Sequence, residues 1–401
     1  MKELLTLISL GVGLLPMCAL LAQGKKTPLD LPPGQYDESR VPTYTLPDPL
    51  VMVSGERVSD TSAWITKRRP EILRLFEENV YGKAAVDRPN GMHWRTMSED
   101  RNVLNGSAIK RKLTIFLSDE DAWPKCDVEI ILPKKSGPVP VFLASTWVPD
   151  AGLVVKNGFG LVTFDAREIE PDDKDSAYVK GVRKFFGPPD RREPEPSEWG
   201  TIAAWSWMLR RVMDCIETDT SIDAHRVCLL GFSRFGKAAM WAGAQDKRFA
   251  MIISCESGCG GATIVRRRFG ETVKLINGQF PHWFCGNFKQ FNDRVNDLPV
   301  DWHMLIALMA PRPVYLSTAE EDLWGDPLGT FLAAAAADPV YALFGEDGLG
   351  ESNMPPVETS IGNFIGYHMR KGKHGLTDYD TNQFIKFAEK HFAAINSVSS
   401  Y

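Results

Sequence analysis

A serine between two glycines is the first group in this sequence whose surroundings suggest chemistry. The turn Gly-Phe-Ser-Arg-Phe-Gly occupies residues 231–236, directly after the apolar residues 227–230 and before a segment rich in Ala, Met and Trp. A serine hydroxyl is a weak nucleophile until a base takes its proton, and a strained strand-to-helix turn is one way in which enzymes expose it. The common spacing of that turn is GxSxG, whereas here the second glycine lies one residue later. Ser233 is therefore a candidate nucleophile, and a structural turn is the alternative interpretation.

A base for this serine is expected late in the chain. In enzymes built on such a turn, the order along the chain is Ser, then a carboxylate, then His. His374 lies in Lys-Gly-Lys-His-Gly, after a predicted strand at residues 365–370 and before the final helical pattern, where such a base would be carried. The other histidines after the serine are interpreted as structural: His282, His303, His368 and His391.

Two carboxylates compete for the role of the acid that orients this base. Glu256 lies in Ser-Cys-Glu-Ser-Gly-Cys-Gly-Gly, and Asp322 lies in the acidic stretch at residues 318–326. Each follows a β-like run, so either could reach the carboxyl edge of a parallel sheet. A turn residue beside glycines is the alternative for Glu256, and a loop cap is the alternative for Asp322. Sequence position leaves the choice between them open.

Charge and composition exclude several functional classes. The chain has 401 residues and a formal net charge of −5, so no general attraction to nucleic acid or to anionic membranes is expected.

Residues 1–22 combine a lysine near the start, an apolar run broken by Gly and Pro, and an Ala before Gln23. This pattern predicts a cleaved signal peptide and an exported protein, secreted or periplasmic, with an N-terminal membrane anchor as the alternative.

Six cysteines follow the predicted signal peptide. The spacing of Cys255 and Cys259 resembles one half of a metal site, but no HExxH and no second CxxC completes one. We therefore predict no metal site at these cysteines and interpret them as core or disulfide residues.

The elements that would position the candidate groups alternate along the chain. Short β-rich runs are separated by helical stretches, and this alternation predicts an α/β sheet with covering helices. The predicted strands are residues 113–116, 128–132, 140–144, 160–164, 226–230, 249–254, 313–317 and 365–370, and the predicted helices are residues 62–78, 202–216 and 380–392.

Taken together, the motifs resemble those of the glucuronoyl esterases of carbohydrate esterase family 15, in particular their bacterial members. The match runs through GFSRFGK, SCESGCGGA, FPHWFCGNF, LMAPRPVYLS, EDLWGDP and KGKHG, in the family's order over residues 226–375. The resemblance implies an α/β-hydrolase fold, a three-layer sandwich with a central, mostly parallel sheet and surface insertions. It also implies hydrolysis, without a cofactor, of the ester between lignin alcohols and 4-O-methyl-glucuronic acid side chains of glucuronoxylan.

The resemblance gives each reactive candidate a role. Ser233 matches the nucleophile and His374 the base. Glu256 and Asp322 match two alternative positions of the acid, and some relatives keep both. Arg234 matches an arginine that stabilises the oxyanion, which makes chemical sense because a fixed cation lowers the energy of a developing alkoxide.

Further residues are implied on the sugar side of the site. Lys237 matches a lysine that contacts the uronate hydroxyls, and Trp324 matches a tryptophan that contacts the sugar. Gln279 and Asn287 lie where other polar sugar contacts are expected. A surface lysine and a core tryptophan are the alternative interpretations of the first two. Phe232 replaces the cysteine of fungal members, so their disulfide is absent and a bacterial type of site is indicated.

The predicted organisation is one decorated catalytic domain. Residues 1–22 are the signal peptide, residues 23–100 are an N-terminal arm and helix packed on the catalytic domain, and residues 101–395 are the α/β-hydrolase domain. Surface insertions are predicted near residues 183–200 and 344–356, where members of the family differ most.

The predicted partner is glucuronoxylan with its lignin–carbohydrate esters. A monomer without nucleic acid or stable membrane insertion is expected. A broader carbohydrate esterase, acting on acetyl or uronate alkyl esters, is one alternative function. A non-catalytic secreted glycan-binding protein is another, and the complete set of Ser, Arg, Lys, acid and His argues against it.

Overall fold

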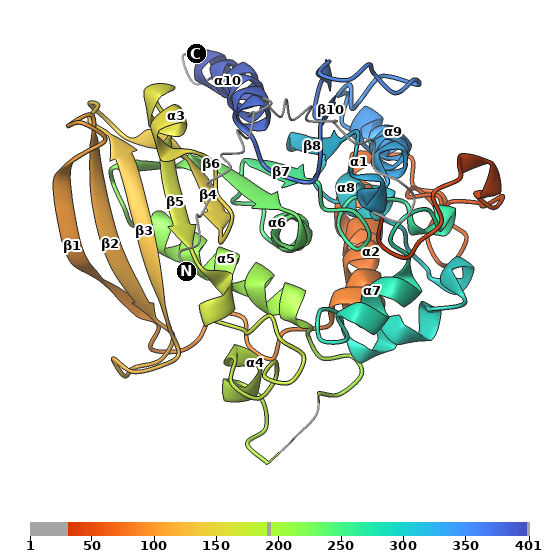
Figure 1. The fold of residues 1–401 in the computed structure, drawn as a ribbon, viewed down its shortest axis with the longest axis horizontal. Coiled ribbons are helices and arrows are strands. Elements are labelled where there is room, and N and C mark those ends of the chain that lie inside the picture. Colours follow the sequence, from red (N-terminus) through yellow and green to blue (C-terminus); the bar gives the residue numbers. More distant parts are fainter. Residues whose placement is uncertain (1–30, 191–193, 399–401) are drawn as a thin grey trace, which may run out of the picture. The chain divides into compact units, whose positions relative to one another are not determined.

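One sheet of ten strands organises the described residues, 31–190 and 194–398, of the computed structural model (Figure 1). The order of the strands is β1-β2-β3-β5-β4-β6-β7-β8-β10-β9. The strands from β5 to β10 in this order are parallel, whereas β1, β2, β3 and β9 pair antiparallel with their neighbours. Their bounds are β1 His93–Val103, β2 Ala108–Phe116, β3 Lys125–Pro133, β4 Val139–Ser145, β5 Gly160–Phe164, β6 Ile222–Phe232, β7 Met251–Cys255, β8 Val314–Ala319, β9 Ile361–Gly362 and β10 Ile365–Arg370.

The burial of the strands explains which of them the sequence reveals. All residues of β4, β7 and β8 are buried, as expected for parallel strands covered on both faces. These strands appear in the sequence as continuous apolar runs, and all eight predicted strands overlap observed ones. Neither β1 nor the two-residue β9 was predicted; the residues of β1 are mostly charged, polar and exposed.

Helices cover both faces of the sheet and form two separate apolar cores. Val141 and Leu143 of β4 face the larger core, whereas Phe142 and Ala144 face the smaller one. In Figure 1, α3 and α10 lie on one side of the sheet, and α5 and α6 lie on the other. The predicted three-layer arrangement is therefore confirmed. The helices are α1 Thr61–Ala63, α2 Arg69–Phe76, α3 Ala151–Lys156, α4 Val182–Phe185, α5 Thr201–Ile216, α6 Arg234–Gln245, α7 Val273–Gln279, α8 Trp302–Ala307, α9 Pro327–Leu343 and α10 Asp378–Val398.

The segment before α2 is extended and contacts residues that follow β7 in the chain. Gln35 forms a β-bridge with Gly270, and the Pro47 carbonyl accepts a hydrogen bond from His303 Nε2 at 2.8 Å. The predicted signal peptide lies outside the described residues. Among the described residues, no helix has both the length and the apolar character needed to cross a membrane.

The six cysteines after residue 30 are all buried, and none of them forms a disulfide. Of the two interpretations offered by the sequence, the core interpretation is therefore confirmed. Part of the predicted insertion at residues 183–200 also packs inward, because Trp199 is almost fully buried. Residues 191–193 of this segment lie outside the described residues.

The N-terminus of α9, which the sequence analysis did not predict, fixes a loop that matters for the site. Asp326 caps the helix by accepting a hydrogen bond from the Gly329 N–H at 2.9 Å. Its carboxylate also receives Arg267 Nε at 2.8 Å, and both side chains are almost fully buried. Glu38 binds the same guanidinium from the N-terminal segment, at 2.7 Å, but is half exposed. The loop at residues 322–325 is thereby fixed at its C-terminal end.

Asp326→Ala should destabilise the protein much more than Glu38→Ala. Removing Asp326 deletes a helix cap and leaves Arg267 buried without its buried partner, a change that costs about 3–5 kcal/mol of unfolding free energy. Removing the exposed Glu38 should cost about 1 kcal/mol or less. Urea denaturation of both variants measures the difference, and equal losses would contradict this ranking.

Candidate active site

Ser233 occupies a strained turn between β6 and α6. Its backbone has φ 56° and ψ −127°, a region that non-glycine residues rarely adopt. The Ser233 N–H donates to the Cys255 carbonyl at 2.8 Å, which ties the turn to the end of β7. Strain of this kind persists only where surrounding contacts enforce it, and it gathers at functional sites.

Close packing explains the glycines on either side of this turn. A Cβ atom on Gly231 would lie 2.1 Å from the Phe235 carbonyl oxygen. A Cβ atom on Gly236 would lie 2.9 Å from the Ser257 Cβ. The first turn of α6 therefore packs directly on the end of β6 and on the loop after β7. The second glycine, Gly236, lies one residue later than in GxSxG and is the residue of α6 that approaches the Ser257 side chain.

His374 lies beside the serine turn, in the loop after β10. Its imidazole packs against the ring of Phe232, the residue before Ser233, with 4.7 Å between the ring centroids. Within the described part of the chain, the Ser233 hydroxyl has no hydrogen-bond partner. Catalytic hydrogen bonds are often loose without substrate, so this geometry is compatible with a serine and its base.

Both candidate acids contact the same nitrogen of His374. Nδ1 lies 2.7 Å from Asp322 Oδ2 and 3.0 Å from Glu256 Oε2. Glu256 follows β7 and Asp322 follows β8, and these neighbouring parallel strands end at the same edge of the sheet. The expectation that either acid could reach this edge is thus met by both at once. Because Nδ1 faces the two carboxylates, Nε2 is the nitrogen left to accept a proton.

The two carboxylates change the proton affinity of the base. Burial alone would lower the pKa of His374, but the hydrogen bonds and charges of Asp322 and Glu256 raise it to about 9. Burial raises the pKa of Glu256, whose side chain is fully buried, against the lowering effects of His374, Arg370 and the Gly375 N–H. The imidazolium form of His374 is therefore strongly favoured.

Arg234 is fixed by an acid and by aromatic rings. Its guanidinium binds Asp172 Oδ2 at 2.5 Å, and its carbon lies 4.9 Å from the centre of the Trp283 ring and 5.6 Å from that of Trp147. Despite burial, hydrogen bonds from His282, Trp283 and Arg234 lower the pKa of Asp172 to about 2. Asp172 therefore stays ionised opposite the arginine.

Lys237 and Trp324 both contact Glu271, a residue that was not predicted from the sequence. Lys237 is buried, and its Nζ donates to the carbonyls of Ser257 at 2.7 Å and Cys259 at 2.5 Å. The same Nζ lies 3.7 Å from the buried carboxylate of Glu271, which also accepts a hydrogen bond from the Trp324 side chain. The structure therefore joins two predicted sugar contacts through Glu271.

The two remaining predicted sugar contacts differ in their surroundings. Gln279 is exposed at the C-terminal end of α7. The Asn287 side chain donates to the Glu78 carbonyl at 2.8 Å and accepts from Gln290 at 3.0 Å. Asn287 thus already has protein partners at both ends of its amide. A sugar contact by either residue stays a prediction.

The sequence offered little signal for the partners Asp172 and Glu271. Asp172 is one of several acids in the stretch at residues 170–175, and it lies 62 residues before Arg234. Glu271 belongs to no motif used in the sequence analysis. His282 was interpreted as structural, whereas its Nε2 lies 3.1 Å from Asp172 at the edge of the site.

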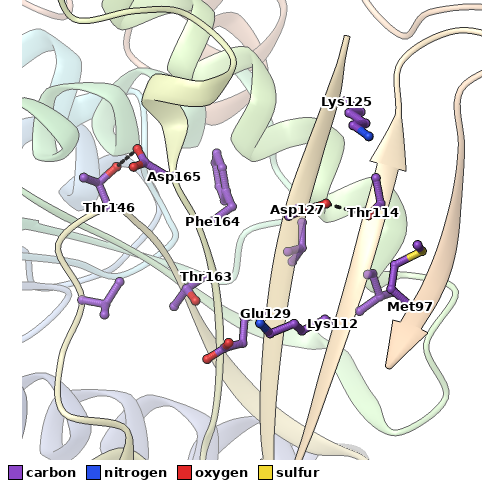
Figure 2. A pocket seen from close by; sticks show the side chains of 13 residues that line it. Met97, Lys112, Thr114, Lys125, Asp127, Glu129, Thr146, Thr163, Phe164 and Asp165 are labelled. Carbon is purple, nitrogen blue, oxygen red and sulfur yellow. Dashed lines mark hydrogen bonds between the residues drawn. The ribbon is translucent and has the colours of Figure 1, made fainter. Parts of the chain in front are cut away.

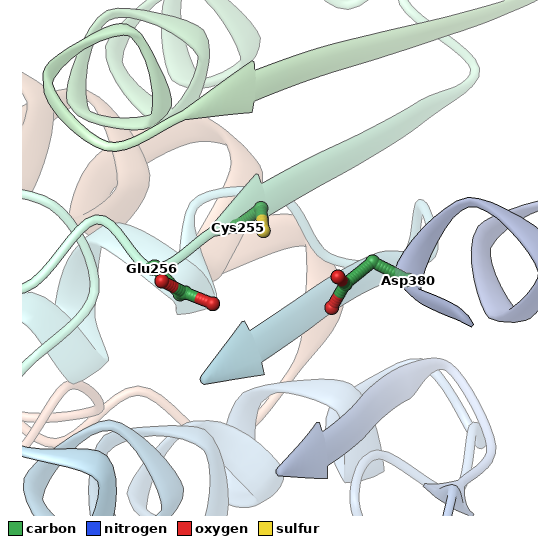
Figure 3. A group of neighbouring side chains, drawn as sticks. All are labelled: Cys255, Glu256 and Asp380. Atoms are coloured by element: carbon green, nitrogen blue, oxygen red, sulfur yellow. The ribbon is translucent and has the colours of Figure 1, made fainter. Parts of the chain in front are cut away.

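Within the described residues, two groups of side chains each bring three possible metal ligands close together, but both are explained without an ion. Glu256, Asp322 and His374 form one group, and their ligand atoms are already partners of one another. Cys255, Glu256 and Asp380 form the other (Figure 3). Burial and then the nearby carboxylates raise the pKa of the Cys255 thiol well above its usual value, which opposes the thiolate form that metals bind.

A separate groove of about 540 Å³ lies across β1, β2, β3 and β5 (Figure 2). None of the candidate catalytic residues lines it. Its acids have partners within the protein: Thr114 donates to Asp127 at 2.6 Å, and Lys110 pairs with Glu129 at 2.5 Å. Polar side chains at alternate positions are normal on a sheet face in contact with water, so the lining of the groove requires no ligand to explain it.

Comparison with known proteins gives a consistent result. A family model described as "Glucuronyl esterase, fungi" matches residues 115–345. A carbohydrate esterase of an unknown prokaryotic organism is 41% identical to this chain over 399 residues, which cover 89% of this chain and 91% of that protein.

Solved structures agree with these sequence matches. A glucuronoyl esterase from Solibacter usitatus has 43% sequence identity and a TM-score of 0.84, over 88% of this chain and 99% of that one. An enzyme described as a promiscuous CE15 esterase from the marine bacterial metagenome has 41% identity and a TM-score of 0.81, over 89% of this chain and 100% of that one. These likenesses confirm the predicted α/β-hydrolase fold.

The imidazole of His374 should titrate near pH 9, and Asp322→Asn and Glu256→Gln should each lower its pKa, because each removes a carboxylate that stabilises the imidazolium. NMR titration measures this directly, with His391 as an internal control that neither change should move. Since the pKa is raised from about 6.5 in the unfolded chain, the stabilisation is complete below pH 6.5 and is lost as pH rises towards 9. A wild-type His374 that titrates near 6.5 would contradict the proposed contacts.

Proposed function

Because this chain belongs to the family of glucuronoyl esterases, we propose that its hydrolysis of glucuronic acid esters is carried out by Ser233, His374 and the carboxylates of Glu256 and Asp322. The observation that carries this proposal is the position of His374. Its Nδ1 faces two carboxylates, while its ring packs beside the strained serine turn. These contacts support roles for Ser233 as nucleophile, His374 as base and the carboxylates as orienting acids in acyl transfer.

In the proposed reaction, Ser233 Oγ attacks the carbonyl carbon of the uronate ester while His374 Nε2 accepts the hydroxyl proton. The tetrahedral intermediate collapses, the ester C–O bond breaks, and the departing alcohol takes the proton from His374. Water then attacks the glucuronoyl-enzyme, again giving a proton to His374, and Ser233 regains that proton as the acid leaves. The carboxylates keep Nδ1 protonated and stabilise the imidazolium at each step.

Arg234 is proposed to stabilise the oxyanion together with backbone N–H groups of the turn. The aromatic rings and Asp172 fix the guanidinium before the substrate arrives, which supports a preorganised role. A fixed cation next to a developing alkoxide lowers the energy of the transition state more than that of the ground state.

The uronate sugar is proposed to lie against the group formed by Lys237, Glu271 and Trp324. Tryptophan offers an apolar face to a pyranose ring, and a buried ion pair can orient sugar hydroxyls. Gln279 is proposed as a further contact at the rim. A sugar contact by Asn287 stays a prediction, because both ends of its amide already bind protein groups.

The natural substrate is proposed to be the ester between lignin alcohols and (4-O-methyl)-glucuronic acid side chains of glucuronoxylan, hydrolysed by a secreted monomer. Trp147 supports an aromatic alcohol, because it is exposed while its ring also packs 5.5 Å from Phe232 and 5.4 Å from Phe235. A broader esterase activity is the second candidate, favoured by the similarity to an enzyme described as promiscuous.

Kinetics on a panel of esters tests the substrate class. We expect benzyl glucuronate to be hydrolysed with a higher kcat/KM than methyl galacturonate or acetylated xylan. Ser233→Ala should lower kcat on benzyl glucuronate by about 10⁴–10⁶-fold, since the nucleophile is lost, without lowering the melting temperature. Equal turnover across the panel would favour the broader esterase, and full activity of the alanine variant would refute the proposed nucleophile.

Substituting Arg234 tests the oxyanion role. Arg234→Met should lower kcat by about 10²–10³-fold with little change in KM, because the interaction is made mainly in the transition state. Asp172→Asn is the matched variant: it keeps the cation but removes its carboxylate partner, and it should have a smaller effect. A raised KM with unchanged kcat in Arg234→Met would instead indicate a ground-state contact with the sugar.

A further inference from the structure

The two acids at His374 have different surroundings behind them. Both oxygens of Glu256 are engaged: Oε1 accepts from Arg370 at 2.7 Å, and Oε2 accepts from the Gly375 N–H at 2.9 Å as well as facing His374. Among the described residues, the only side-chain partner of the Asp322 carboxylate is His374. Glu256 is thus fixed from two further directions, whereas Asp322 is fixed from none.

Arg370 is itself fixed on the side away from Glu256. It is the last residue of β10 and is almost fully buried, and its Nε lies 3.0 Å from Asp380 Oδ2 in an ion pair without hydrogen-bond geometry. Asp380 Oδ1 lies 2.9 Å from His368 Nε2, and Thr377 Oγ1 donates to Oδ2 at 2.6 Å. Figure 3 shows Asp380, at the start of α10, and Glu256, after β7, lying in the same interior region.

The same guanidinium also shapes the loop that carries His374. Its Nη1 donates to the Lys371 carbonyl at 2.7 Å, and its Nη2 donates to the carbonyls of Lys373 and Gly375, both at 2.6 Å. One buried cation therefore contacts the acid and both chain neighbours of the base. Any displacement of Arg370 would move Glu256 and His374 relative to each other.

The contact between Arg370 and Glu256 also balances charge in the interior of the protein. Three carboxylates, those of Glu256, Asp322 and Asp380, gather around His374 and Arg370, with the buried Cys255 thiol and His368 beside them. Buried carboxylates that lack a cation become protonated, because desolvation and like charges disfavour the ionised form. Arginine is the residue best suited to prevent this, since it stays protonated when buried.

We propose that Arg370, secured by Asp380, is a positioning residue of the active site that keeps Glu256 ionised and aimed at His374. Glu256 is then the permanent orienting acid, and Asp322 is a second acid free to adjust its contact with the base during the reaction. The proposal rests on the triad proposed above, but its main readout, the titration of His374, does not depend on substrate.

The test compares Arg370→Gln with Glu256→Gln, which should move the pKa of His374 in the same direction. Without the Arg370 cation, the buried Glu256 becomes protonated and no longer stabilises the imidazolium, so the pKa of His374 should fall by about one unit, as it does when the Glu256 anion is removed. The acidic limb of the pH profile of kcat/KM should shift to lower pH in both variants. Arg370→Lys keeps the charge, so its acidic limb should stay at the wild-type position.

Arg312→Gln is the matched control. Arg312 is also a buried arginine that donates to three carbonyls, those of Gly243, Asp246 and Phe249, but it lies before β8, at the opposite end of the strand from Asp322. Its loss should destabilise the fold without moving the titration of His374. If Arg370→Gln does not fold, the NMR signal of the Glu256 carboxyl carbon gives a second readout. This signal should show an ionised carboxylate at pH 7 in the wild type and in Arg370→Lys.

The substitutions can also be combined. In the Asp322→Asn background, Arg370→Gln should reduce kcat more than it does in the wild type, because Glu256 is then the only acid. In the Glu256→Gln background it should add little. The proposal is overturned if Arg370→Gln leaves the pKa of His374 unchanged or raises it, or if Glu256 is protonated at pH 7 in the wild type. If the wild type lacks the proposed esterase activity, the proposed function is contradicted, but the titration results remain valid.

Discussion

The close approach of α6 to the end of β6 is the constraint on which the site depends. Gly231 and Gly236 leave no room for a side chain, and the chain between them turns sharply enough to give Ser233 a positive φ. Because β6 lies between β4 and β7 in the sheet, the loops after these strands surround the turn on both sides. The loops after β7, β8 and β10 then supply the carboxylates and the histidine without any long excursion of the chain.

Three buried or half-buried cations surround this turn, and each has an acid opposite it. Arg234 binds Asp172, Lys237 lies near Glu271, and Arg370 binds Glu256. Removing charges from water costs several kcal/mol per ion, and a buried pair offsets this only when its hydrogen bonds are complete. The site is therefore sensitive to the loss of a single partner, and its acids and cations have to be understood as pairs.

Features with a local sequence pattern could be predicted, whereas contacts between residues far apart in the chain could not. Buried parallel strands show as apolar runs, and the serine turn and the late histidine follow chain order. By contrast, the exposed strand β1 has no apolar pattern. Arg370 contacts Glu256 across 114 residues, and no spacing rule connects them. The choice between Glu256 and Asp322 could not be made from sequence because both reach the same nitrogen.

The environment of Arg234 is consistent with the oxyanion role proposed for it. Asp172 binds one terminal nitrogen, and its low pKa keeps that bond charged. A cation fixed by its acid and by aromatic rings needs little rearrangement to meet a developing negative charge, which supports the oxyanion role proposed for Arg234.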